Sequence, residues 1–235
     1  MRPGEPLLDG AWIADHLDDI GLRLGQHLGI SVLAVVVGLA IAMALALWAR
    51  RTPGLRGPVT GVTGILYTIP SLAMFAALVP FTGLTLLTAE IPLVVYTLLI
   101  LFRNIMAGFD GVPTDVKEAA DGMGFRSGER LRRIELPLAV PLIIAGIRLA
   151  SVSTIGLVMI VSLLGRNFGG LGVFITEGIQ TFFATKVYVG AALSVTLAVA
   201  ADLALVALER RATPWGRDRV AAIPLGPIKT PEWIP

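Results

Sequence analysis

Two oppositely charged residues, Arg148 and Asp202, stand inside stretches that are otherwise apolar. A charge within a membrane-spanning helix is costly, so it is usually paired or faces water. Asp202 shortly precedes the basic pair Arg210 and Arg211, which places it at about the depth of Arg148. We predict that Arg148 and Asp202 pair across helices near the inner side of a pathway. The alternative is that each side chain extends to water or lines a dimer contact separately.

Residues for catalysis or metal binding do not gather in this sequence. Cysteine is absent, and the two histidines, His16 and His27, have no carboxylates at a matching ligand spacing, so we expect simple solvent exposure for both. There is no Ser/His or Cys/His constellation and no GxxxxGK[ST] phosphate loop. We therefore expect no catalytic residue, metal or cofactor in this chain. If the function needs ATP hydrolysis, another protein must carry it out.

The composition indicates a membrane protein. Of the 235 residues, 55% are hydrophobic and only 15% are charged, and the mean hydropathy is +0.79. Soluble domains carry about 25% charged residues. Too few polar side chains remain to cover a soluble fold of this size, so lipid must solvate much of the surface.

Long uncharged segments predict an all-α membrane protein with about five transmembrane helices. At about 1.5 Å per residue, the runs 30–49 and 57–89 can each cross a hydrocarbon core of about 30 Å. The segment 165–186 is interrupted by glycines, and we expect an outward-facing loop with a short helix there. We place the five helices at residues 30–49, 59–79, 91–109, 138–164 and 187–208.

The basic residues orient these helices. Most of the 19 lysine and arginine residues fall on one side of the membrane if the N-terminus is outside and the C-terminus inside. This asymmetry follows the positive-inside rule and predicts an N-out, C-in protein of the plasma or inner membrane. The basic residues then need no nucleic-acid partner. The exceptions expected on the outer side are Arg2, Arg23, Arg166 and Lys186.

The patterns divide the chain into three regions. Residues 1–29 form an extracytoplasmic segment, in which apolar residues recur at helical spacing over 13–28. That spacing predicts either an interfacial helix or an amphipathic extension of the first span. Residues 30–208 form the transmembrane domain. Residues 209–235 are rich in charge and proline, and we expect a loosely ordered cytoplasmic tail.

Prolines and aromatic residues inside the spans are further candidates for function. Pro70 and Pro141 lack a backbone donor and could act as helix hinges, although static kinks are commoner. Aromatic rings could face a quaternary ammonium ion in a pathway through cation–π attraction, although packing is the commoner role. The rings in question are Tyr67, Phe75, Tyr96 and Phe102.

The longest charged insert between spans, residues 110–137, is the most informative segment. Loops in compact proteins are usually short, so a folded insert of this length suggests a partner. Pro113 suits the first position of a short helix that Gly122 and Gly124 would end. Ser127 could then cap a second helix. An amphipathic loop on the lipid headgroups is the alternative.

The motif Glu118-Ala119-Ala120, then Gly124, then Ile134-Glu135-Leu136-Pro137, resembles the EAA loop of binding-protein-dependent ABC importer permeases. The resemblance implies the type I ABC importer permease fold. In that family the loop is a coupling helix that docks on a cytoplasmic ATPase. Carried over by position, the ATPase-coupling residues would be Glu118, Ala119, Ala120, Asp121, Gly122 and Gly124.

Other segments resemble the osmoprotectant subfamily, whose cargoes are glycine betaine, carnitine, choline and related quaternary amines. The resemblance covers most of the membrane domain. Residues 165–168 depart from it, because a smaller, glycine-rich approach would be expected there. The matching segments are 67–73, 103–104, 136–141, 145–148 and 169–172.

The resemblance implies a permease subunit that forms half of the pathway for a small solute. It would need a second permease subunit, identical or paralogous, a separate ATPase that binds ATP and magnesium, and an extracytoplasmic solute-binding protein. The alternatives are a permease for another small solute, such as an amino acid or derivative, an ATP-independent channel or carrier, and a scaffold. Carriers usually show inverted repeats and paired acidic residues at mid-membrane, and neither is evident in this sequence.

Overall fold

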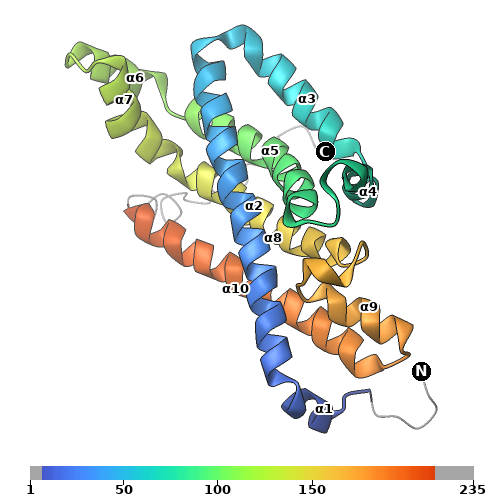
Figure 1. The fold of residues 1–235 in the computed structure, drawn as a ribbon. Helices are drawn as coiled ribbons and strands as arrows, with labels where there is room; N and C mark the ends of the chain where they lie inside the picture. The colour runs from blue at the N-terminus through green and yellow to red at the C-terminus, as the bar shows by residue number, and fades with distance from the viewer. Residues whose placement is uncertain (1–6, 215–235) are drawn as a thin grey trace, which may run out of the picture.

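The computed structural model describes residues 7–214 as an elongated assembly of helices (Figure 1). Residues 1–6 and 215–235, which include most of the expected tail, lie outside the described residues. The elements are α1 (Gly10–Asp15), α2 (Leu17–Arg51), η1 (Pro53–Leu55), α3 (Arg56–Thr68), α4 (Ser71–Thr82), α5 (Leu86–Asp110), α6 (Thr114–Gly122), α7 (Ser127–Arg130), η2 (Leu131–Glu135), α8 (Leu136–Val161), η3 (Arg166–Phe168), α9 (Gly172–Gln180) and α10 (Ala184–Ala212).

Four helical runs are long and apolar enough to cross a membrane. They are α2, α5, the run Ser127–Val161 that contains α8, and α10. The pair α3 and α4 meets the same criteria only when its two helices are taken together, and it bends by 92°. The described residues thus contain four such spans, or five when the bent pair counts as one, which agrees with the prediction of about five.

The span predicted over 59–79 is broken into α3 and α4 at Pro70, one of the two predicted hinge prolines. The backbone of Ile69 is extended, with φ −65° and ψ 129°, and α4 starts directly after Pro70. Proline has no N–H to continue the helix, and it disfavours the helical conformation in the residue before it. The Ile69 carbonyl instead accepts a hydrogen bond from the hydroxyl of Tyr96 in α5. A tertiary hydrogen bond therefore stabilises the break between α3 and α4.

Helices α2, α5 and α8 form the centre of the molecule and pack on one another along their length. Small residues permit this close packing, as in many membrane bundles. A Cβ atom on Gly38 of α2 would lie 1.9 Å from Thr97 Oγ1 of α5, and one on Gly146 of α8 would lie 2.5 Å from Asn104 Cβ of α5. Buried small residues of α2 recur every four positions, at Ala34, Gly38, Ala42 and Ala46.

The N-terminal amphipathic segment continues into the first span without a break from Leu17 onward. Of the two alternatives, the structure therefore has the extension of the span. The short helix α1 before it is capped by Asp9, whose Oδ1 accepts from the Ala11 and Trp12 amides at 3.0 and 3.1 Å. The Trp12 ring then packs edge-on against Phe183, with centroids 5.6 Å apart.

The expectation of solvent exposure is wrong for His27, which is 0% exposed. Its Nδ1 accepts a hydrogen bond from the Leu171 amide at 3.3 Å. Its Nε2 must then carry the proton, which it donates to the Ile155 carbonyl at 3.0 Å. The neutral ring thus ties α2 to α8 and to the glycine-rich loop before α9. The buried face of α2, which includes Ile30 and Ala34, extends outward by one turn to reach it.

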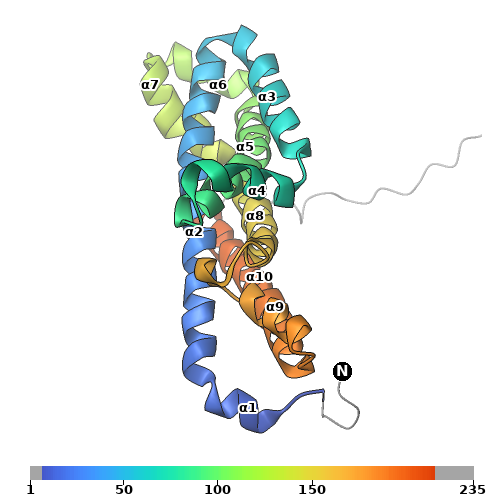
Figure 2. The same ribbon diagram turned by 45° about the vertical axis from the view of Figure 1, so that its right-hand side comes forward.

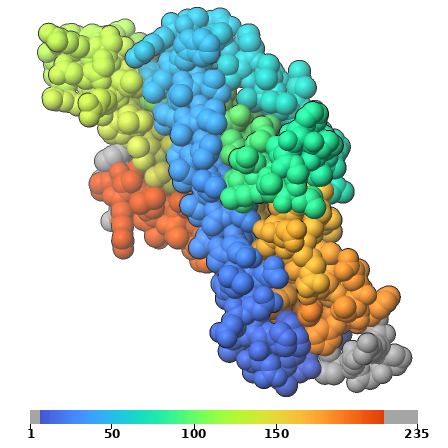
Figure 3. All heavy atoms as spheres, in the orientation of Figure 1, coloured from blue at the N-terminus to red at the C-terminus, as the bar shows by residue number. Residues whose placement is uncertain are grey.

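The two ends of the molecule differ in character. Helices α1 and α9 lie at one end, and α6 and α7 lie at the other (Figure 2). The basic end of α2, at Arg50 and Arg51, meets the α6–α7 end, because Arg50 forms an ion pair with Glu135. The space-filling view shows α6 and α7 projecting beyond the central helices (Figure 3). This projecting hairpin is accessible to another protein.

Candidate functional site

Helix α6 exposes both acidic and small residues on its surface. Glu118 and Ala119 are exposed, whereas Ala120 is 0% exposed and packs inward. The two alanines of the motif therefore differ in role. Ala119 adds little side-chain volume to the exposed surface, whereas Ala120 lets α6 pack closely against the rest of the chain. Lys117 holds the helix against the end of α5 by donating to the Phe109 carbonyl at 3.4 Å.

The end of α6 depends on the backbone of Gly124. This residue has φ +82°, a left-handed conformation that glycine adopts without strain. Its amide donates to the Asp121 carbonyl at 3.0 Å, and the Phe125 amide donates to the Ala120 carbonyl at 3.2 Å. These two bonds form a Schellman motif. Gly122, the last residue of the helix, has no positive φ, so the chain turns at Gly124.

Some local predictions for this segment were off by one residue. Pro113 precedes the first helical residue of α6, where Pro at the first position was expected. Ser127 is the first residue of α7, and Arg126 occupies the capping position before it. Sequence reasoning also overlooked Met123, which is 68% exposed at the tip of the hairpin. Its position between Gly122 and Gly124, the two glycines expected to end the helix, could have indicated an exposed apolar side chain.

The predicted partners Arg148 and Asp202 lie together in the structure. Arg148 Nε donates to Asp202 Oδ1 at 2.8 Å, and Arg148 Nη2 donates to Asp202 Oδ2 at 3.1 Å. Two parallel bonds of this kind are the preferred geometry of arginine with a carboxylate. Glu209 adds a third contact, with its Oε2 3.5 Å from Arg148 Nη1. The arginine therefore joins α8 to α10 through two carboxylates, and sequence reasoning identified only one of them.

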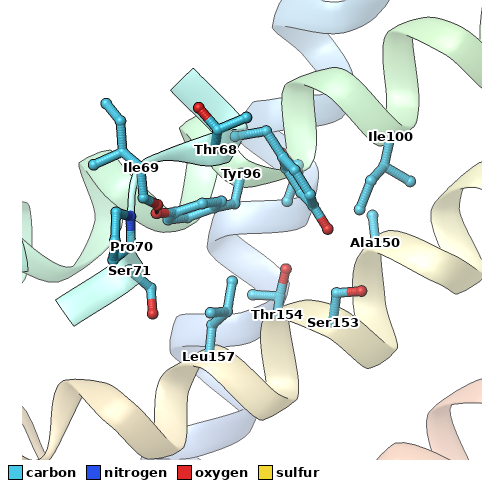
Figure 4. A pocket seen from close by; sticks show the side chains of 12 residues that line it. Thr68, Ile69, Pro70, Ser71, Tyr96, Ile100, Ala150, Ser153, Thr154 and Leu157 are labelled. Atoms are coloured by element: carbon cyan, nitrogen blue, oxygen red, sulfur yellow. Dashed lines mark hydrogen bonds between the residues drawn. The ribbon is translucent and has the colours of Figure 1, made fainter. Parts of the chain in front are cut away.

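A cavity of about 390 Å³ lies beside the break between α3 and α4. In Figure 4, Ile69, Pro70 and Ser71 line one side, and Ser153, Thr154 and Leu157 of α8 face them from the other. Its lining contains hydroxyls, apolar groups and aromatic rings but no charged side chain. The volume is within the range of small-molecule sites.

Two of the four predicted aromatic residues line this cavity. The rings of Tyr67 and Tyr96 meet edge to face, with centroids 5.7 Å apart. Tyr67 is 42% exposed and can present its ring to a ligand. Phe75 and Phe102, by contrast, are buried in the packing between helices. Of the predicted hinges, Pro70 lies at the cavity wall, and Pro141 lies within α8, which continues through it.

We predict that Tyr96→Phe destabilises the break between α3 and α4. The substitution keeps the ring but leaves the Ile69 carbonyl without the hydroxyl that donates to it. Loss of a buried partner costs about 1–3 kcal/mol, so the unfolding temperature in detergent should fall measurably. Tyr67→Phe is the matched control, because the Tyr67 hydroxyl has no such backbone acceptor within residues 7–214. Equal stability of the two variants would contradict the prediction.

Within residues 7–214, no group of three or more His, Cys, Asp or Glu residues is placed to hold a metal ion.

Comparison with known proteins identifies the family. Residues 30–214 match the family described as "Binding-protein-dependent transport system inner membrane component". The glycine betaine/carnitine/choline transport system permease protein OpuCB of Bacillus subtilis is 36% identical over 195 residues, which cover 83% of this chain and 88% of that protein. The carnitine transport permease protein OpuCB of Listeria monocytogenes is 38% identical over 190 residues, covering 80% and 86%.

Solved structures show the same fold. An inward-facing form of the MetNI methionine ABC transporter matches with a TM-score of 0.70 and 21% identity, over 88% of this chain and 100% of that one. An amino acid ABC transporter solved with histidines matches with a TM-score of 0.71 and 18% identity, over 87% and 99%. The chain therefore belongs to the binding-protein-dependent inner membrane components, and it is the transmembrane permease subunit of an ABC importer whose ATPase is a separate subunit.

Proposed function

We propose that this permease carries a quaternary-amine osmoprotectant of the glycine betaine, choline or carnitine class. The observation that supports this cargo is the uncharged cavity with the ring of Tyr67 on its wall. A quaternary ammonium group has no N–H to donate, so it is best held by aromatic faces. The cargoes named for the relatives from Bacillus subtilis and Listeria monocytogenes are of this class.

Membership in the family implies a separate ATPase and a solute-binding protein as partners. We further propose that a second permease subunit, identical or paralogous, completes the pathway. The cavity supports this arrangement, because it opens at the surface of the single chain, where Tyr67 is partly exposed. A second subunit against this side would enclose the solute, and Pro70 in the cavity wall is then placed to act as a hinge. Pro141, further along α8, is the other proposed hinge.

We also propose that α6 is the coupling helix and that its exposed small residues form the surface that docks on the ATPase. Three features support this role. The hairpin of α6 and α7 projects from the inner end of the molecule (Figure 3). Glu118, Ala119, Gly122 and Gly124 are exposed on it, and the glycine-dependent turn fixes where the helix stops. Asp121 is also exposed, and it forms an ion pair with Arg130 of α7 within the same hairpin.

The cargo is tested by uptake into vesicles that contain the whole importer. Radiolabelled glycine betaine, choline and carnitine are offered singly, with methionine as a competitor. We expect uptake of at least one quaternary amine that is inhibited by the other two and not by methionine. Uptake of radiolabelled methionine by the same vesicles, with no uptake of any of the three amines, would reject the proposed cargo and leave the permease assignment intact.

The role of the Tyr67 ring leads to a second prediction. Tyr67→Leu should weaken the apparent affinity for a quaternary amine by about twofold to thirtyfold, because a cation–π contact is worth about 0.5–2 kcal/mol. Tyr67→Phe keeps the ring face and should stay within about twofold of the unaltered protein. The measurement is the concentration dependence of uptake at fixed ATP. Equal affinities in the two variants would show that the ring does not contact the cargo.

A further inference from the structure

We propose that Glu135 transmits the movement of α6 to the first transmembrane helix, α2, through a chain of ion pairs. The chain runs from Asp121 in α6 through Arg130 in α7 and Glu135 in η2 to Arg50 at the end of α2. The inference rests on the proposed role of α6 as the coupling helix. It adds the residues that carry the motion into the membrane domain.

The chain has a defined geometry. Arg130 Nε donates to Glu135 Oε1 at 2.9 Å, and Arg130 Nη1 donates to the carboxylate of Asp121. Arg50 Nη2 donates to Oε2, the other carboxylate oxygen of Glu135. Each arginine has a planar fork of donors, so a pair made with it fixes direction as well as distance. The four side chains therefore connect four elements, α6, α7, η2 and α2, in defined directions.

Glu135 is the central member because it is only 1% exposed. A buried carboxylate must be compensated by opposite charge and hydrogen bonds. Here the two compensating groups come from opposite sides, one from the projecting hairpin and one from α2. A displacement of either arginine leaves the buried charge partly unpaired. When α6 moves, the buried charge stays paired only if α2 moves with it.

The connection also reaches α5. The guanidinium carbon of Arg50 lies 4.3 Å from the centroid of the Phe109 ring, near the end of α5. Glu135 itself ends a π-helical turn, Leu131–Glu135, just before α8. Such turns are rare and often occur at functional positions. The ends of α2, α5 and α8 therefore meet around one ion cluster.

The ion chain links elements that pack mainly on other partners. Helix α6 packs on α7 and η2, whereas α2 packs chiefly on α5 and α8. Movement of the hairpin can reach α8 along the continuous helical run. For α2, the pair between Arg50 and Glu135 is a direct connection to the hairpin. The proposed residue is thus a positioning residue, which acts through α6 and touches neither ATP nor solute.

The experiment measures solute moved per ATP hydrolysed, with the complete importer in vesicles. Arg50→Gln and Glu135→Gln keep the approximate size of each side chain and break the pair. We expect the ATPase to stay bound and active, while solute moved per ATP falls about fivefold or more in each variant. The double variant should be no worse than either single one, within about twofold, because both changes remove the same link. Additive losses would overturn the proposal.

Arg51→Gln is the matched control. It removes the same charge from the next residue of α2, and Arg51 is exposed and has no ion pair among residues 7–214. Solute moved per ATP should be unchanged in this variant. An equal loss in Arg51→Gln and Arg50→Gln would show that the effect is one of net charge, and it too would overturn the proposal.

Asp121→Asn provides a second test should the buried change impair folding. Asp121 is exposed, and its amide form weakens the chain at the α6 end. We expect uncoupling again, with the ATPase retained on purification. Wild-type solute moved per ATP in both Asp121→Asn and Arg50→Gln would reject the ion chain. Loss of ATPase binding is the separate signature of a damaged docking surface, so failure of this inference and failure of the coupling role of α6 give different results.

Discussion

Gly124→Val should greatly reduce solute uptake and detach the ATPase from the purified permease, while leaving the protein in the membrane. The residue has φ +82°, which costs a side chain about 1–2 kcal/mol and is least accessible to β-branched residues. The Schellman bonds that end α6 would therefore be lost, and the exposed turn would carry a branched side chain where a partner must approach. Together we expect a loss of uptake of about 100-fold.

Two controls separate backbone strain from bulk on the docking surface. Gly124→Asn adds a side chain of similar size, but asparagine tolerates the left-handed conformation and is the usual second choice at this position. A Cβ at Gly124 or at Gly122 meets nothing within 4 Å in the single chain. Gly122→Ala therefore should not harm the permease itself, and any loss of ATPase binding in it would arise from contact with the partner.

The pattern of results decides the role of the turn. If strain dominates, Gly124→Asn retains most of the uptake that Gly124→Val loses. If close approach dominates, both variants fail and Gly122→Ala weakens binding as well. Retention of both the ATPase and full uptake in Gly124→Val would show that α6 is not the coupling helix.

Much of this fold could be predicted because lipid simplifies the sequence pattern. The spans must be apolar, so the approximate number of helices follows from composition along the chain. The inner loops must be basic, and the N-out, C-in orientation stays a prediction from that rule. The end of α6 could also be predicted, since Gly122 and Gly124 are local signals that need no tertiary information. The pairing of Arg148 with Asp202 was predictable in the same way, because each charge in an apolar helix demands compensation.

Features that depend on distant segments were not predictable. Pro70 indicated a possible bend in the span 59–79, but the sequence did not reveal that the hydroxyl of Tyr96 from another helix binds the Ile69 carbonyl there. His27 was expected to be exposed, because nothing nearby in the sequence reveals that Ile155 and Leu171 supply its partners. Such contacts arise from tertiary packing.

The same limit applies to the ion cluster at the inner end. Arg50 and Glu135 are 85 positions apart, and each looks alone like one of many basic or acidic residues flanking a span. Only the fold shows that Arg50, at the end of α2, forms an ion pair with the buried carboxylate of Glu135. Some of the basic residues beside the inner ends of the spans thus only orient the chain in the membrane. Others, such as Arg50, also bind a specific partner in the fold.

The second large effect is expected for the pair in the membrane. Arg148→Asp or Asp202→Arg alone places two like charges together between α8 and α10, and either single reversal should reduce uptake by at least about 100-fold, because an apolar environment screens charge poorly. Exchanging the two charges restores the attraction with its direction reversed. The double variant Arg148→Asp, Asp202→Arg should therefore recover a large part of the lost uptake.

Glu209 determines how this exchange must be made. Its carboxylate lies 3.5 Å from Arg148, so an aspartate at position 148 would face a like charge even after the exchange. Recovery should consequently be greater in a Glu209→Gln background, and Glu209→Gln alone should have a small effect because the bidentate pair with Asp202 remains. Uptake and membrane insertion are measured for each variant. If insertion is normal and the exchange restores nothing in either background, the two charges act separately, and Arg148 does not bind α10 through Asp202 during transport.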